Sequence, residues 1–303
     1  MFKQIILGVG NNPLVSKTIG QYGMQLGASR FVAGATLDEA IRVVKDLNRR
    51  HMAATLDHLG ESVTRLDEAA AARDSYLQML DMIAETHVQS HVSVKLTMMG
   101  MAISEEAAAN NLEAIVARAH EVQSFVRIDM EDSHFTTQTL RLFQDVWARY
   151  PDNVGVVLQA YLYRTMEDLK ALSDPPKNFR IVKGAYQEPP SLAYPSKPDV
   201  DDNYVALVEA SLHNGNYTAV ATHDEQMIGK VLRYVASHNI PNDQFEFQML
   251  YGVKLSVLED LAQRGYTTRV YVPWGRDWYA YYLRRIAERP ANLLFFARSL
   301  TKR

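Results

Sequence analysis

The chain has 303 residues, 32 Lys+Arg against 35 Asp+Glu, and no cysteine. The absence of cysteine excludes a disulfide scaffold, a cysteine zinc site, an iron–sulfur centre and a thiol nucleophile. The formal net charge of -3 gives no whole-chain electrostatic argument for nucleic-acid binding, and the length fits either two domains or one large α/β barrel.

The first fifty residues contain a glycine-rich turn followed by a helical pattern. Residues 8–13, Gly-Val-Gly-Asn-Asn-Pro, imitate the start of a dinucleotide-binding fingerprint. Pro13 stands where Gly or Ala is needed, however, and Asp38 falls in the first turn of a helix instead of closing a second strand. We therefore favour a simple turn before a helix over Leu37 to Asn48, with Thr36 as its N-cap.

Short apolar runs and amphipathic segments alternate through the rest of the chain. The runs, eight in all, are Met52–Leu56, His91–Leu96, Phe125–Met130, Val154–Ala160, Phe179–Val182, Tyr217–Thr222, Phe245–Leu250 and Thr268–Val272. The amphipathic segments are Glu68–Glu85, Ser104–Val122, Thr137–Arg149, Met166–Ala171, Asn203–Asn214, Gln226–His238, Leu255–Gln263 and Tyr279–Arg289. This alternation predicts an α/β fold, a (β/α)₈ barrel over residues 51–303 preceded by a helical arm over residues 1–50. An open doubly wound sheet is the alternative.

No targeting or membrane-spanning segment is evident. The apolar run Ile5 to Val9 is too short for a signal-peptide core, and nowhere do apolar residues continue for the roughly 18 positions that a membrane helix needs. We expect a cytoplasmic protein whose contact with a membrane, if it makes one, is peripheral.

Polar residues close every predicted strand, which is where a barrel places catalytic groups. They are Asp57, Lys95, Asp129, Glu131, Gln159, Arg180, Lys183, Thr222, His223, Gln248 and Tyr271. Loops are polar in any protein, so a single member carries little weight. Lys95 and Gln159 nevertheless lie inside apolar patterns, where an unpaired polar group would be costly. The histidines do not cluster and no HExxH occurs, so we expect no metal site.

A tract rich in aromatic residues and arginine follows the last predicted strand. Arg284 and Arg285 are adjacent, and neighbours on a helix diverge by about 100°. Two guanidinium groups are well suited to holding one carboxylate. The alternative is a solvated helix in which Arg284 pairs with Glu288. The surrounding aromatic residues favour a pocket wall.

The ordered set of motifs resembles the proline dehydrogenase family, in its monofunctional bacterial form and in the corresponding domain of bifunctional proline utilisation flavoenzymes. The matching segments include Thr55-Leu56-Asp57, Ser93-Val94-Lys95-Leu96, Ile128-Asp129-Met130-Glu131, Gln159-Ala160-Tyr161, residues 180–186, Ala221-Thr222-His223, residues 245–250 and residues 271–292. The resemblance implies a distorted (β/α)₈ barrel with N-terminal helices and the last helix over the barrel mouth.

The resemblance also implies a noncovalent FAD and oxidation of L-proline to Δ1-pyrroline-5-carboxylate by hydride transfer to flavin N5, with electrons passed to a membrane quinone. It assigns catalytic roles to Lys95, Arg180, Arg284 and Arg285. The implied substrate-binding residues are Lys95, Asp129, Tyr186, Leu250, Tyr271, Arg284 and Arg285. The implied cofactor-binding residues are Asp129, Met130, Gln159, Arg180, Val182, Gly184, Ala185, Tyr186, Thr222, His223, Gln248, Arg285 and Glu288.

Two further expectations concern partners and alternatives. No aldehyde dehydrogenase domain follows the barrel before Arg303, so we expect a separate pyrroline-5-carboxylate dehydrogenase, in transient contact, to take the product, and no nucleic-acid partner. The alternatives are a flavin barrel of the methylenetetrahydrofolate reductase type, reduced by a nicotinamide, and a binding barrel that has lost its cofactor.

Overall fold

A closed barrel of eight parallel strands forms the centre of the molecule, as the alternating pattern predicts. The computed structural model describes residues 28–60 and 62–288, with the side chains of 284 and 286–288 left aside. Each strand pairs with the next in sequence, and β8 pairs with β1. The strands are β1 (Ala53–His58), β2 (Ser90–Val94), β3 (Val126–Ile128), β4 (Val154–Gln159), β5 (Asn178–Val182), β6 (Tyr217–Ala221), β7 (Phe245–Leu250) and β8 (Thr268–Trp274). The predicted fold class is confirmed.

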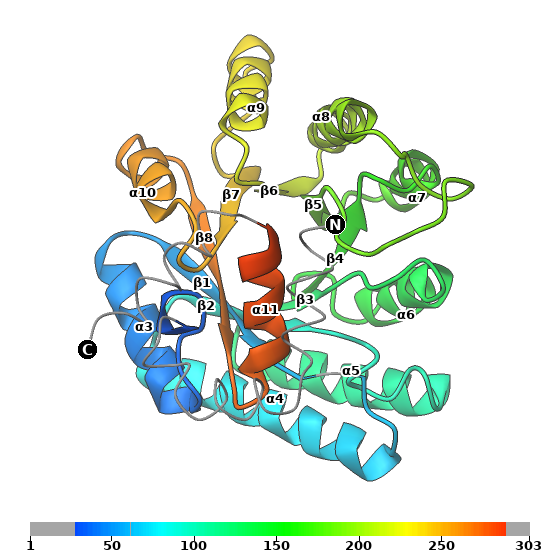
Figure 1. Ribbon diagram of the computed structural model, residues 1–303, viewed down its shortest axis with the longest axis vertical. Helices are drawn as coiled ribbons and strands as arrows, with labels where there is room; N and C mark the ends of the chain where they lie inside the picture. The colour runs from blue at the N-terminus through cyan, green and yellow to red at the C-terminus, as the bar shows by residue number, and fades with distance from the viewer. Residues whose placement is uncertain (1–27, 61, 289–303) are drawn as a thin grey trace.

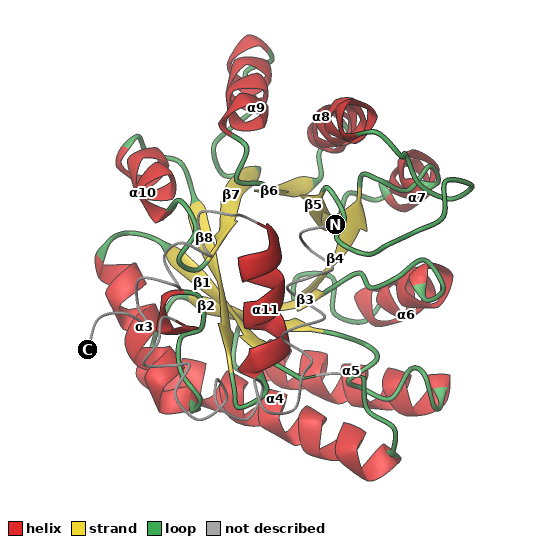
Figure 2. Ribbon diagram, in the orientation of Figure 1, coloured by secondary structure: helices red, strands yellow, loops and turns green. Residues whose placement is uncertain are grey.

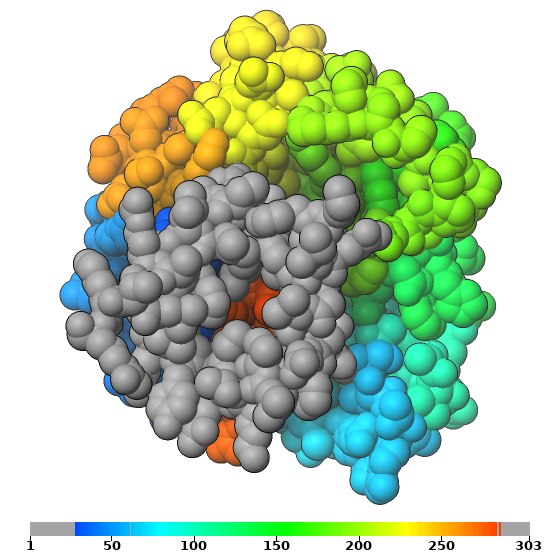
Figure 3. All heavy atoms as spheres, viewed as in Figure 1, coloured from blue at the N-terminus to red at the C-terminus, as the bar shows by residue number. Residues whose placement is uncertain are grey.

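Most of the helices in the described chain surround the strands on the outside of the barrel, and the last lies over its opening (Figures 1 and 2). They are η1 (Ala28–Arg30, a 3₁₀ turn), α3 (Leu37–Arg49), α4 (Leu66–Thr86), α5 (Glu105–Glu121), α6 (Thr136–Trp147), α7 (Thr165–Leu172), α8 (Lys197–His213), α9 (Glu225–Ser237), α10 (Leu255–Gln263) and α11 (Trp278–Glu288). In the space-filling view the colours follow one another around the rim, and the orange α10 region closes against blue α3 (Figure 3).

Capping residues account for where several helices begin. Thr36 accepts from the backbone N–H of Glu39, whose side chain accepts from the N–H of Thr36, so α3 starts with a complete capping box. Ser196 caps α8, which begins at Lys197, six residues before the predicted start at Asn203. The predicted start was wrong because Pro198, which would break the interior of a helix, lies here in the first helical turn, where proline is favoured.

Helices α3 and α11 occupy different places around the barrel. Helix α3 packs against β1 and β8, which puts it in the outer ring. Helix α11, which follows β8, instead lies across the barrel opening (Figure 1). A small apolar cluster that includes Phe31, Leu59 and Tyr282 holds α11 to the arm and to the loop after β1. The helix expected over the mouth is therefore confirmed.

The barrel interior contains several charged side chains. Strand residues that face outward, such as Val92 and Val94, are fully buried against the helices, and each such side chain contributes about 1.5 to 3 kcal/mol to folding. The inward positions instead include Arg180, Glu246 and Arg269, all buried. Buried charges are stable only when they are paired, so the interior must contain ion pairs or bind a charged ligand. Among the described residues no helix is both long and apolar enough to cross a membrane.

Candidate active site

A cavity of about 430 Å³ opens at the carboxyl ends of the strands, beneath α11. In a (β/α)₈ barrel this end carries the active site. The cavity is lined by every residue of the predicted site whose side chain the structure describes: Lys95, Asp129, Met130, Gln159, Arg180, Val182, Gly184, Ala185, Tyr186, Thr222, His223, Gln248, Leu250, Tyr271 and Arg285. Arg284 and Glu288 lie outside the described side chains.

Several lining residues were missing from the predicted site. They are Asp57, Leu59, Gly60, Val157, Lys183, Ala221, Met249 and Tyr281. Asp57 and Lys183 did appear among the polar residues at strand ends, and this position could have placed them in the predicted site. Val157 lies two positions before Gln159 and therefore faces the same side of β4. Alternation along the strand could have identified it.

The carboxylate of Asp129 is the centre of one hydrogen-bond network on the cavity floor. Oδ1 accepts from Nη1 of Arg180 and from the hydroxyl of Ser93, each at 2.8 Å. Oδ2 accepts from the hydroxyl of Tyr271 at 2.7 Å. Burial and the charges of Asp129 and Asp57 raise the pKa of Tyr271 well above its ordinary value, so this phenol remains a neutral donor. Hydrogen bonds thereby connect β2, β5 and β8 to the residue that directly follows β3.

Lys95 lies between two carboxylates. Its Nζ is 2.5 Å from Oδ1 of Asp57 and 3.7 Å from Oδ2 of Asp129. Burial by itself would lower the pKa of Lys95, but the negative charge of Asp57 outweighs it and raises this pKa well above its ordinary value. Burial, reinforced by repulsion from Asp129, raises the pKa of Asp57. At neutral pH Lys95 is therefore protonated, and it places a positive charge at the edge of the cavity.

The roof of the cavity contributes a second cation. The guanidinium of Arg285 lies 5.1 Å from the ring centroid of Tyr281, within range of a cation–π contact on the same helix. Both residues line the cavity. Lys95 below and Arg285 above therefore provide positive charge from opposite sides of one space, which suits an anionic group such as a carboxylate.

Arg180 and Gln159 carry polar atoms that no described residue satisfies. Nε and Nη2 of Arg180 and Oε1 of Gln159 are buried without a hydrogen-bond partner among the described residues. An unsatisfied buried polar group costs about 1 to 3 kcal/mol, so such atoms point to a ligand. Two donors and one acceptor along the cavity wall fit a planar heterocycle that has both acceptor atoms and an N–H, as an isoalloxazine ring has.

A buried ion pair lies one layer below the cavity. Nε of Arg269 is 2.9 Å from Oε1 of Glu246. Burial alone would raise the pKa of Glu246, but Arg269 lowers it to about 2. The side-chain amide of Gln248 also donates to Glu246, which fixes Gln248 in the cavity wall. The charge pair thus supports the floor of the site.

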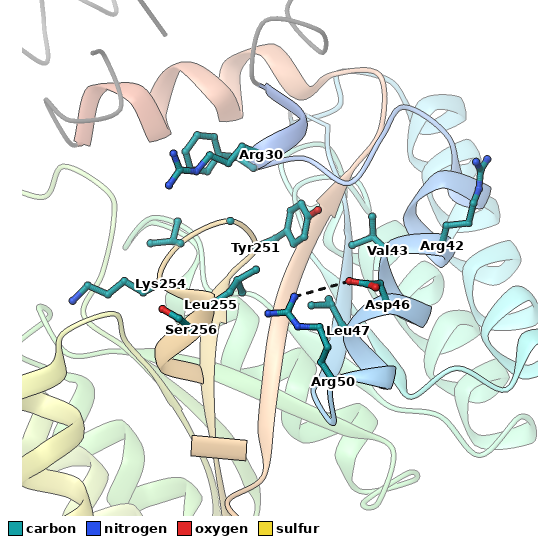
Figure 4. Close-up of a pocket in the computed structure, with 13 residues that line it drawn as sticks. Arg30, Arg42, Val43, Asp46, Leu47, Arg50, Tyr251, Lys254, Leu255 and Ser256 are labelled. Atoms are coloured by element: carbon teal, nitrogen blue, oxygen red, sulfur yellow. Dashed lines mark ion pairs between the residues drawn. The ribbon is translucent and has the colours of Figure 1, made fainter. Parts of the chain in front are cut away.

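A larger hollow lies elsewhere. A groove of about 830 Å³ runs between α3 and the loop after β7, outside the strand ends (Figure 4). Its Arg50 is already bound to Glu259 at 2.8 Å and lies 4.0 Å from Asp46. The argument for the site therefore rests on the unsatisfied polar atoms of the smaller cavity, not on volume. No group of three His, Asp or Glu residues suited to a metal occurs in the described part of the chain.

Comparisons with known proteins identify the family to which the sequence is similar. Residues 40–298 match the family model described as proline dehydrogenase. Proline dehydrogenase 1 of Bacillus subtilis strain 168 is 43% identical over 303 residues, covering 100% of both chains. Proline dehydrogenase of Deinococcus radiodurans is 41% identical, covering 100% of this chain and 98% of that protein. Bifunctional protein PutA of Escherichia coli K12 is 25% identical, covering 97% of this chain and 25% of that protein.

A solved structure has the same fold. The crystal structure of proline utilization A from Bdellovibrio bacteriovorus, inactivated by N-propargylglycine, superposes with a TM-score of 0.82 at 26% identity. The match covers 90% of this chain and 34% of that protein, so this chain corresponds to about a third of the crystallised one.

Proposed function

Because this chain belongs to the proline dehydrogenase family, we propose that it oxidises L-proline to Δ1-pyrroline-5-carboxylate at the barrel mouth, using a bound FAD. The observation that carries the proposal is the cavity itself. Fixed cations at its edge and unsatisfied polar atoms in its wall supply what an amino-acid carboxylate and a flavin ring need.

The carboxylate of proline would lie between Lys95 and Arg285. Arg284 would also bind it, a role that rests on the family resemblance alone. Fixing this end of the substrate leaves the five-membered ring against the apolar faces of Tyr271 and Leu250. Binding in this manner orients the ring carbon next to nitrogen, the carbon that must lose a hydride, and so removes orientational entropy from the reaction. With substrate and cofactor bound, the same walls and α11 would exclude water from the reacting atoms.

Arg180 and Gln159 would hold the flavin edge, since their buried atoms have no partner among the described residues. A bound flavin supplies the two-electron acceptor, at N5, for the hydride that leaves the proline ring. The positive charge of Arg180 would stabilise negative charge that develops on its ligand. The remaining electron acceptor, a membrane quinone, is proposed from the family resemblance.

A neighbouring hollow of about 750 Å³ supports FAD over a shorter flavin. It shares Lys183, Thr222 and His223 with the cavity, and Lys197 and Lys254 also line it. Lysines at this position suit a diphosphate, although each already pairs with a carboxylate. Asp201 and Asp224 pair with Lys183, at 2.5 and 3.2 Å, and also with Lys197, while Glu225 pairs with Lys254. Flavin extracted from the purified protein should therefore be FAD by mass spectrometry, and recovery of FMN alone would contradict the proposal.

Anaerobic titration with L-proline tests the activity directly. The purified protein should be yellow, and its absorbance near 450 nm should bleach as proline is added. D-proline, the enantiomer of the substrate, serves as the matched control, because its carboxylate and ring cannot both occupy the same positions. Bleaching by a nicotinamide but not by proline would instead indicate a reductase of the methylenetetrahydrofolate type, and a colourless protein that takes up no FAD would indicate a binding barrel.

A further inference from the structure

We propose that Asp57 is a positioning residue that holds Lys95 where it binds the substrate carboxylate. This inference rests on the proposed oxidation of proline and adds a residue to that site. Asp57 ends the inward-facing row of β1 and is 2% exposed. Its Oδ1 is 2.5 Å from Nζ of Lys95.

Without Asp57, the ammonium of Lys95 has a second carboxylate to which it can turn. Lys95 follows the end of β2, and its side chain is 24% exposed, so the ammonium can change direction. Asp129 lies 3.7 Å from it, on the side of β3. Asp57 is the nearer partner and holds Lys95 toward β1. Loss of this contact would therefore draw Lys95 toward Asp129 and away from the space that faces Arg285.

The electrostatic surroundings of Lys95 are shared among several elements. The charged and titratable groups around it are Asp57 and His58 on β1, Tyr76 on α4, Asp129 and Glu131 after β3, Arg180 on β5, Tyr271 on β8 and Arg285 on α11. Asp57 is the strongest of those that raise the pKa of Lys95. Its loss would lower this pKa, so Lys95 would lose its proton, and its affinity for a carboxylate, at a lower pH than in the wild type.

Asp57→Asn is the first test, because it keeps the shape of the side chain and removes the charge. We expect KM for L-proline to rise about 10- to 100-fold while kcat changes less than threefold, since a displaced cation weakens ground-state and transition-state binding alike. The affinity for cyclopentanecarboxylate, which has the ring and the carboxylate but no amine, should fall by the same factor. KM should also rise with pH from a lower pH than in the wild type.

A double-mutant cycle with Lys95→Met separates positioning from a general effect on the fold. If Asp57 acts through Lys95, adding Asp57→Asn to Lys95→Met should leave KM within about twofold. Independent, multiplying effects would overturn the proposal, and so would tighter cyclopentanecarboxylate binding to Asp57→Asn, which would show that Asp57 acts only by repelling anions. Glu259→Gln is the matched control, because Glu259 also binds a cation, Arg50 at 2.8 Å, but neither residue lines the cavity, so KM should stay unchanged.

Two measurements keep the test decisive. Flavin content and melting temperature show whether Asp57→Asn is folded. If it is not, Asp57→Glu, which keeps the charge on a longer side chain, should fold and raise KM above the wild-type value, by less than the factor expected for Asp57→Asn. Failure of the wild type to oxidise proline would refute the proposed function. An active wild type with an unaltered KM in Asp57→Asn would refute this inference alone.

Discussion

The hydroxyl of Tyr271 donates a 2.7 Å hydrogen bond to Oδ2 of Asp129, joining the last strand of the barrel to the third across the floor of the cavity. Hydrogen bonds to a charged acceptor contribute about 1.5 to 3 kcal/mol. Because the pKa of Tyr271 is raised well above its ordinary value, this bond persists throughout the neutral and mildly alkaline range.

Tyr271→Phe should therefore lower the free energy of unfolding by about 1 to 2 kcal/mol and raise KM for proline several-fold, because Asp129 keeps its bonds to Arg180 and Ser93. Urea denaturation and steady-state kinetics measure the two effects. Tyr266→Phe removes the same hydroxyl just before the start of β8, at the opposite end of the barrel, and should leave KM unchanged. Equal KM values for both variants would contradict a role for the Tyr271 hydroxyl in the site.

Arg180 is expected to bind the cofactor through the two nitrogen atoms that have no partner among the described residues. Arg180→Lys keeps the charge but loses the planar fork, so the flavin content of the purified protein should fall and kcat should drop by about 10²- to 10³-fold. The ratio of absorbance at 450 nm to that at 280 nm reports the content. Full flavin occupancy with unchanged kcat would place the cofactor elsewhere.

Arg285 is expected to bind substrate from the roof of the cavity. Arg285→Met should raise KM for proline about tenfold to 100-fold with flavin still bound, since a hydrogen bond to a charged group contributes about 1.5 to 3 kcal/mol. Arg276→Met, an exposed residue of the loop before α11, is the control of identical chemistry. If both variants raised KM equally, the effect would come from net charge and not from the cavity.

Periodicity in the sequence predicted the barrel because each strand buries its outward side chains against a helix. The limits of β7, Phe245–Leu250, and of α10, Leu255–Gln263, coincide with the predicted ones. Those segments are bounded by Gly and polar residues, which stop an apolar pattern clearly. The predicted start of α8 was wrong because proline occurs both in loops and in first helical turns, and the local sequence around Pro198 does not show which of the two applies.

The side-chain pairs that form between neighbouring strands could not be predicted from the sequence. Lys95 stood out as a cation in an apolar run, yet its partner Asp57 is 38 positions away, and only the register of β1 against β2 brings them together. The same holds for Glu246 and Arg269, which meet because β7 and β8 are neighbours. Residue types at strand ends predicted where chemistry could occur, while the distances that define the site depend on closure of the barrel.

The buried pair Glu246–Arg269 should make stability depend on acid. The pKa of Glu246 is lowered to about 2 in the folded protein, whereas its ordinary value is 4.5. A carboxyl whose pKa is lower in the folded state stabilises that state above its unfolded pKa. This stabilisation, about 3 kcal/mol, is lost as the pH falls from about 4.5 to about 2.

Glu246→Gln should therefore lower the free energy of unfolding by about 3 to 5 kcal/mol at pH 7, because it leaves the buried charge of Arg269 without a counter-ion. The difference in free energy of unfolding between wild type and variant should shrink as the pH is lowered from 5 toward 3, because the stabilisation from ionised Glu246 in the wild type is progressively lost over this range. Urea denaturation at each pH measures it. Glu259→Gln, which breaks the more exposed pair with Arg50, should change stability little at any pH. A difference that stays constant with pH would mean that Glu246 contributes through packing and not through its charge.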